Sequence, residues 1–148
     1  MIQKSSLLAV LCLSALAANA EIINIDNAEL VRLAGSGVPV VDIRTEGEWK
    51  TTGVIAGSNL LTYFDENGRA NPPQWLERLQ GVAKSDQPVI LVCRSGKRSR
   101  VASEFLSEQS GYKKVYNVTS GLNGWSGEHR PMVPPATSMA VCPFGAKC

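Results

Sequence analysis

Histidine is nearly absent from this chain: of 148 residues, His129 is the only one. It stands in a proline-flanked stretch, so it is not a credible general base. The four cysteines are scattered along the sequence rather than grouped at the spacing of metal ligands. The sequence therefore predicts no metal site and no cofactor.

A strong excess of charge of one sign is also absent. The formal net charge is +2, and the aromatic residues, 6% of the chain, do not alternate with basic ones. Proteins that bind nucleic acid usually carry a pronounced basic surface. Nucleic acid is therefore not an expected partner. The hydrophobic fraction of 44% is typical of one ordinary globular domain with a real core.

Long apolar runs are limited to one stretch near the N-terminus. The run LLAVLCLSALAA follows a segment with one lysine and no acid, and it ends in the small-x-small triplet Ala18-Asn19-Ala20. It is shorter than the ~20 residues of a membrane span and typical of a secretory signal peptide. We expect residues 1–20 to be a signal peptide and the protein to be periplasmic or secreted, with no membrane attachment after cleavage. An uncleaved anchor or a buried helix are the alternatives.

Cleavage would remove Cys12 and leave Cys93, Cys142 and Cys148. In an oxidising compartment, an odd number of cysteines leaves one thiol free or available to a partner. Cys142 and Cys148 are close in sequence, so we expect them to pair with each other and Cys93 to stay free. A link between Cys93 and either of them would instead indicate a thiol redox function.

After residue 20, short β-branched runs alternate with stretches of helical spacing. Asp26 and Asn71 are predicted helix caps, because each precedes an apolar helical pattern and has Glu or Gln three residues later. Strands are predicted at 21–25, 38–44, 58–61, 87–92 and 113–118. Helices are predicted after Asp26, ending at Gly35 or Gly37, and at 46–50, 72–80 and 97–110. This alternation indicates crossover units and a parallel sheet, hence an α/β fold.

The C-terminal part of the chain has weaker signals. GLNGWSGE, residues 121–128, is predicted to be a loop with a final turn. Residues 129–148 contain four prolines and no periodicity, so we expect a tail outside the sheet, partly ordered at best. The predicted organisation is a signal peptide at 1–20, one domain at 21–128 and this tail.

Cys93 stands where a predicted strand ends and a predicted helix begins. At that edge of a parallel sheet, backbone N–H groups and the start of a helix favour an anion, here the Cys93 thiolate. The predicted active-site loop is Cys93, Arg94, Ser95, Gly96, Lys97, Arg98 and Ser99. Its glycine allows a tight turn and its three cations would attract an anionic substrate. The alternative is a buried structural cysteine beside a solvated basic helix start.

The loop length argues against a tyrosine phosphatase, which has an arginine six residues after its cysteine. Ser99 occupies that position here. The shorter ring suits a sulfur atom on the cysteine better than a phosphoryl group.

The sequence resembles the rhodanese (sulfurtransferase) family, in particular single-domain exported members. The matching stretches are VVDIRTEGEW at 40–49, GVIAGSNLL at 53–61, VILVCRSGKRS at 89–99 and GLNGW at 121–125. The resemblance implies a three-layer α/β fold, with a parallel sheet flanked by helices on both faces. It departs from the family at Val54, where relatives often have histidine.

The resemblance also implies a mechanism. Cys93 would take sulfane sulfur from thiosulfate or a similar donor and pass it, as a persulfide, to a thiophilic acceptor, with ping-pong kinetics. Asp42 matches a position that braces the active loop, and Arg44 one that holds the neighbouring segment. Partners beyond these small molecules are not implied, and a monomer is expected. The alternatives are a partner-binding module without turnover and a thiol redox protein.

Export can be tested directly. N-terminal sequencing of the protein recovered from expressing cells should begin near Glu21, and fractionation should place the protein outside the cytoplasm. Retention of Met1 in a cytoplasmic protein would contradict the signal peptide and remove the reason for a disulfide in the tail.

Overall fold

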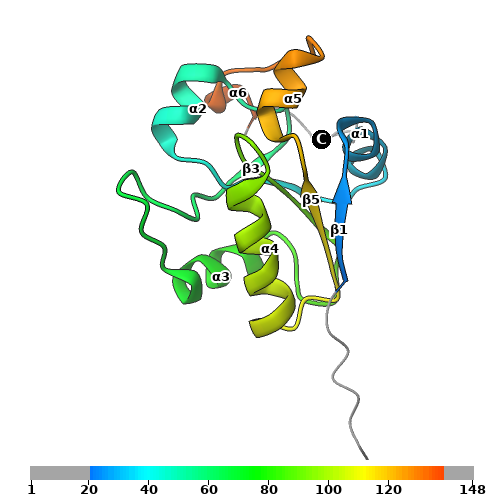
Figure 1. Ribbon diagram of the computed structural model, residues 1–148, viewed down its shortest axis with the longest axis vertical. Helices are drawn as coiled ribbons and strands as arrows, with labels where there is room; N and C mark the ends of the chain where they lie inside the picture. Colours follow the sequence, from blue (N-terminus) through cyan, green and yellow to red (C-terminus); the bar gives the residue numbers. More distant parts are fainter. Residues whose placement is uncertain (1–20, 139–148) are drawn as a thin grey trace, which may run out of the picture.

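The computed structural model describes residues 21–138 (Figure 1). The expected signal peptide, Cys12 and the expected Cys142–Cys148 pair lie outside the described residues. Among the residues that are described, Cys93 is a free thiol. No helix in this part of the chain is long and apolar enough to cross a membrane.

Strands form one parallel sheet in the order β1-β5-β4-β2-β3. The strands are β1 (Glu21–Ile25), β2 (Val40–Asp42), β3 (Asn59–Leu60), β4 (Val89–Val92) and β5 (Lys114–Val118). The helices are α1 (Asn27–Gly35), α2 (Glu46–Thr52), α3 (Pro72–Gln80), α4 (Lys97–Gln109), α5 (Gly121–Gly127) and α6 (Pro135–Ser138). The predicted parallel α/β sheet is confirmed.

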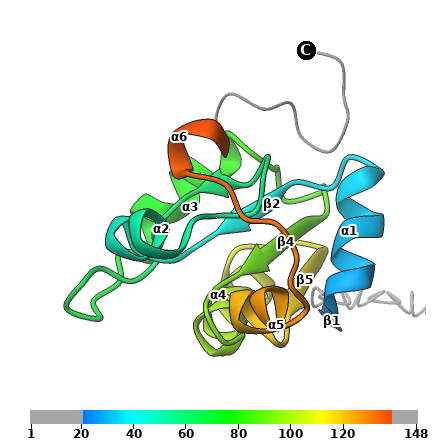
Figure 2. The ribbon, with the colours of Figure 1, turned by 90° about the horizontal axis from the view of Figure 1, so that it is seen from above.

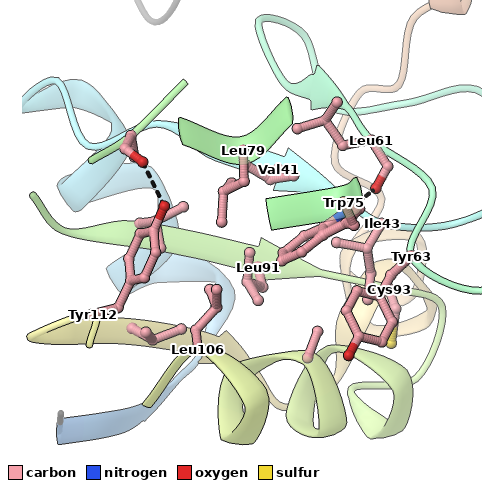
Figure 3. Packing of buried hydrophobic residues seen from close by; sticks show 14 residues of the cluster. Val41, Ile43, Leu61, Tyr63, Trp75, Leu79, Leu91, Cys93, Leu106 and Tyr112 are labelled. Atoms are coloured by element: carbon pink, nitrogen blue, oxygen red, sulfur yellow. Dashed lines mark hydrogen bonds between the residues drawn. The ribbon is translucent and has the colours of Figure 1, made fainter. Parts of the chain in front are cut away.

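Alternate residues of the central strands serve two separate cores. Leu91 of β4 packs with residues of α3 and α4 on one face, where Figure 3 shows the cluster. Ile90 packs with residues of α1 and α5 on the other face. In Figure 2, α1 and α3 lie on opposite sides of the central strands. Because both faces are covered, β4 is buried at every residue, as its uninterrupted apolar run predicts.

Local signals mark where the helices begin. The side chains of Asp26 and Asn71 accept hydrogen bonds from the backbone N–H groups of Glu29 and Gln74, which confirms both predicted caps. Helix α2 begins with a capping box between Thr45 and Glu48. These caps fix where α1, α2 and α3 begin.

Residues 121–127, predicted as a loop, form the helix α5. Its three glycines disfavour a helix in isolation, which is why the sequence pattern missed it. Trp125 packs into the second core and donates from its indole nitrogen to the carbonyl of Pro131 at 2.9 Å. Tertiary contacts therefore override the local propensity.

The segment after α5 is attached to the domain. Val133 and Val54 exchange two backbone hydrogen bonds of 2.9 Å in an isolated antiparallel bridge. Met132 packs against the second core beside them. Residues 131–133 thus form a strap over the segment between α2 and β3, although they lie outside the five-stranded sheet.

Candidate active site

The loop after β4 holds the candidate nucleophile. Cys93 follows the last residue of β4, and α4 begins four residues later at Lys97. The alternation along the strand turns the Cys93 side chain to the face covered by α3 and α4, where it is fully buried (Figure 3). The sulfur therefore lies inside the loop rather than on the surface.

Three groups lie within hydrogen-bonding distance of the sulfur. The backbone N–H groups of Gly96 and Ser99 point to Cys93 Sγ, with nitrogen–sulfur distances of 3.2 and 3.4 Å. Ser99 Oγ lies 3.4 Å from the same atom. Two backbone donors converging on one sulfur stabilise negative charge there, as the position of the loop predicts.

The start of α5 keeps the loop in this conformation. The N–H of Leu122 donates to the carbonyl of Cys93, and the N–H of Asn123 donates to the carbonyl of Arg94, both at 2.9 Å. These two carbonyls are thereby directed to α5. The N–H groups of the later loop residues remain free to face the sulfur.

Two glycines permit this close packing. Gly96 has φ +84°, and a Cβ atom there would lie 2.2 Å from the carbonyl oxygen of Thr119. Gly121 has φ +54°, and a Cβ atom there would lie 2.5 Å from the carbonyl oxygen of Cys93. A side chain at Gly96 would push the Cys93 loop away from Val118 and Thr119 at the end of β5, and one at Gly121 would push it away from the start of α5.

The three predicted cations of the loop have different environments. Arg94 and Lys97 are exposed, and neither forms an ion pair within residues 21–138. Arg98 instead makes a bidentate pair with Glu48 of α2, at 2.8 and 2.6 Å. Much of its charge is therefore committed to Glu48 and unavailable to a substrate anion.

The pKa shifts of this pair agree with the geometry. The pKa of the Arg98 guanidinium is raised, first by its hydrogen bonds to Glu48. Partial burial favours a higher pKa for the Glu48 carboxyl, but hydrogen bonds from Arg98 and from the backbone of Thr45 leave that pKa lowered. Both groups are therefore charged at neutral pH, and they tie α2 to the start of α4.

Asp42 and Arg44 form a second, fully buried ion pair. Arg44 Nη2 lies 2.7 Å from Asp42 Oδ2, and the two side chains are 2% and 1% exposed. Arg44 also donates to Thr52 Oγ1 at 2.7 Å and to the carbonyl of Gly53 at 2.8 Å. Within residues 21–138, the hydrogen bonds of the Asp42 carboxylate go to Arg44. The pair thus holds the end of β2 to the end of α2.

A cleft of about 620 Å³ opens beside the loop. Residues of both charges line it: Arg94 and Arg98 on the Cys93 loop, and Glu48, Asp65 and Glu66 across from them. The surface facing a substrate is therefore mixed in charge, whereas the loop sequence alone indicated a purely basic cradle.

Sequence reasoning missed several residues of this site. Glu48 and the acids at 65–66 lie far from Cys93 in sequence, and no local pattern links them to it. The GLNGW stretch matches the family pattern, but its sequence gives no sign of its physical role, which is to bind the carbonyls of the Cys93 loop. Within residues 21–138, no group of three or more His, Cys, Asp or Glu could hold a metal ion.

Comparison with known proteins assigns most of the described chain to one domain family. The rhodanese-like domain family matches residues 26–128. Rhodanese-like domain-containing protein 17 of Arabidopsis thaliana is 29% identical over 116 residues, which are 76% of this chain and 73% of that protein. Thiosulfate sulfurtransferase 18 of the same plant is 29% identical over 108 residues, 71% of this chain and 79% of that protein.

The fold is also shared with solved structures. A crystal structure from M. tuberculosis has a TM-score of 0.62 and 23% sequence identity, and the match covers 78% of this chain and 98% of that one. At this identity the likeness concerns the fold alone. It confirms the predicted three-layer arrangement.

The close approach at Gly96 gives a prediction with an internal control. Gly96→Ala and Gly111→Ala both place a side chain at positive φ, a cost of roughly 1–2 kcal/mol. Only at Gly96 would the new Cβ meet backbone; at Gly111 nothing lies within 4 Å. Urea unfolding should show a loss at least about 1 kcal/mol larger for Gly96→Ala. Alkylation of Cys93 should change only in that variant; equal losses would contradict the role assigned to the close packing.

Proposed function

This chain belongs to the rhodanese-like domain family, and on that basis we propose that it is a sulfurtransferase that carries sulfur on Cys93 as a persulfide. Relatives named as sulfurtransferases support the general class of reaction. The observation that carries the proposal is the pair of backbone N–H groups that converge on the buried sulfur.

In the first half-reaction, the Cys93 thiolate attacks the outer sulfur of thiosulfate or a similar donor. A new S–S bond forms to Cys93 while the bond between the two donor sulfurs breaks. Sulfite leaves with that electron pair, and the negative charge moves to the terminal sulfur of the persulfide. In this proposal the backbone N–H groups of the loop hold this charge, as those of Gly96 and Ser99 point to Cys93 Sγ in the structure. The step moves no proton, so no general base is needed.

In the second half-reaction, a thiophile such as cyanide or a thiolate attacks the terminal sulfur. The persulfide S–S bond breaks and Cys93 leaves as a thiolate, held again by the same donors. Because the donor's remnant departs before the acceptor reacts, ping-pong kinetics are expected.

The exposed cations determine how the donor arrives. Arg94 and Lys97 are unpaired within the described residues and attract the anionic donor to the loop. Arg98, paired with Glu48, mainly fixes the start of α4. The acids across the cleft oppose a dianionic donor and so limit its affinity.

The cellular context remains part of this proposal. We propose a monomer in the periplasm or outside the cell, acting on small-molecule donors and acceptors. Peptide mapping without reductant tests the associated Cys142–Cys148 pair. A main species that links Cys93 to either cysteine would favour the thiol redox alternative.

Cys93→Ser should abolish sulfur transfer from thiosulfate to cyanide while the fold survives, because a serine hydroxyl does not ionise at neutral pH. Mass spectrometry of the wild type after thiosulfate should show one added sulfur atom on Cys93, and the variant should show none. Circular dichroism and urea unfolding provide the fold control. Wild-type turnover by Cys93→Ser would refute Cys93 as the nucleophile.

Neutralising an acid of the cleft should improve the use of an anionic donor. Glu66→Gln is expected to raise kcat/KM for thiosulfate about two- to fivefold, the effect of one unit charge a few ångströms away in water. The gain should shrink at high salt, where the charge is screened. Glu77→Gln makes the same charge change on an exposed residue of α3 that does not line the cleft, and should change nothing. A fall in kcat/KM for Glu66→Gln would show that Glu66 binds the donor instead.

A further inference from the structure

Ser99 has three acceptors within reach of its single hydroxyl proton. Its Oγ lies 2.7 Å from Asn117 Oδ1, 3.2 Å from the carbonyl oxygen of Gly96 and 3.4 Å from Cys93 Sγ. A hydroxyl donates one hydrogen bond at a time. The distance to Asn117 is the usual one for a bond between two oxygens, whereas the distance to the Gly96 carbonyl is long for such a bond. The distance to the sulfur is within reach for a sulfur acceptor, but the oxygen of Asn117 is the closest of the three acceptors. The proton therefore points to Asn117, and the Ser99 lone pairs face the sulfur.

Asn117 is held so that its oxygen faces Ser99. It is 2% exposed on β5, and its Nδ2 donates to Asn24 Oδ1 at 3.0 Å. Asn24 lies directly opposite it on the edge strand β1. This hydrogen bond orients the amide across two strands, and a chain of polar contacts runs from Asn24 through Asn117 and Ser99 to Cys93.

We propose that Asn117 is a positioning residue that restrains the reactivity of Cys93 by holding the Ser99 hydroxyl proton away from the sulfur. The resting thiolate then has two backbone donors, although the Ser99 hydroxyl also lies within hydrogen-bonding distance of it. The inference rests on Cys93 being the reactive group of the proposed function, but it concerns the sulfur itself and can be tested without any sulfur donor.

The charged groups around Cys93 remain the same in the test variants. They are Arg94, Lys97 and Arg98 of the loop and α4, Glu48 of α2 paired with Arg98, and Asp42 paired with Arg44 at the end of β2. Substitution of Asn117 by an apolar residue changes none of these charges. A change in sulfur reactivity can then be assigned to the polar contact.

The first experiment measures the rate of Cys93 alkylation by iodoacetamide as a function of pH, with the ultraviolet absorbance of the thiolate as a second signal. Asn117→Leu keeps the branched shape of the side chain without its polar atoms, removes the acceptor and frees the Ser99 proton for the sulfur. Alkylation at pH values below the titration midpoint should become about two- to tenfold faster, the range that corresponds to one net hydrogen bond. The midpoint should move to lower pH.

A double-mutant cycle separates this effect from a general loosening of the site. Ser99→Ala alone should change the rate less than about twofold, since the hydroxyl does not donate to the resting sulfur. Adding Asn117→Leu to Ser99→Ala should then give no acceleration. Ser103→Ala is the matched control, because it removes a buried hydroxyl one turn further along α4 that donates to the carbonyl of Ser99 at 2.7 Å. It should leave the pH profile unchanged.

Asn24→Ala gives the same test at an exposed position, should Asn117→Leu fail to fold. Without Asn24 the amide of Asn117 is free to turn, so alkylation should accelerate by a smaller factor, and again only when Ser99 is present. Slower alkylation in Asn117→Leu or Asn24→Ala, or an acceleration that persists with Ser99→Ala, would overturn the proposal. If these results hold but no sulfur donor is turned over, the restraint on Cys93 stands and the proposed function fails.

Discussion

The hydrogen bonds from the start of α5 to the carbonyls of Cys93 and Arg94 determine the form of the active site. A peptide unit has its N–H and its carbonyl on opposite sides. Once two successive carbonyls are bonded to α5, the loop turns back and its later N–H groups face the sulfur. The short distances at Gly121 belong to this contact, and those at Gly96 belong to the adjoining contact with Val118 and Thr119. In both places the backbone segments meet without side chains between them. The environment of the nucleophile thus depends on two glycines and on the backbone N–H groups of Leu122 and Asn123.

The rest of the fold supplies rigid supports for this contact. β4 is buried on both faces between β2 and β5, so the point where Cys93 begins is fixed by the sheet. On one side the Asp42–Arg44 pair joins the end of β2 to α2, and α2 in turn holds Arg98 through Glu48. A buried pair of this kind is costly to break, because removal of one partner leaves an unpaired charge. Charged groups near the sulfur therefore secure the position of the loop.

The sequence predicts the parts of this architecture that are determined by residues close together in the chain. The buried run of β4, the caps at Asp26 and Asn71, and the turn glycine at Gly96 each have a local pattern with a physical cause. The helix α5 was missed because glycine disfavours helices, and contacts with Cys93 and Pro131 are what stabilise it. The Glu48–Arg98 pair spans 50 residues of sequence, and one acid among thirteen gives no sign of its partner. Polar pairs between residues far apart in the chain therefore could not be predicted from local sequence patterns.

The near absence of histidine agrees with the environment of the sulfur. A histidine near Cys93 would add a titrating charge, and reactivity would then follow its protonation near neutral pH. Here the donors are backbone N–H groups, whose strength does not change with pH. The remaining neighbour is the neutral hydroxyl of Ser99, whose one proton points to Asn117. In the proposed arrangement, the support for the sulfur depends on the direction of that proton rather than on gain or loss of charge. This suits a group that must serve in turn as thiolate, persulfide and leaving group.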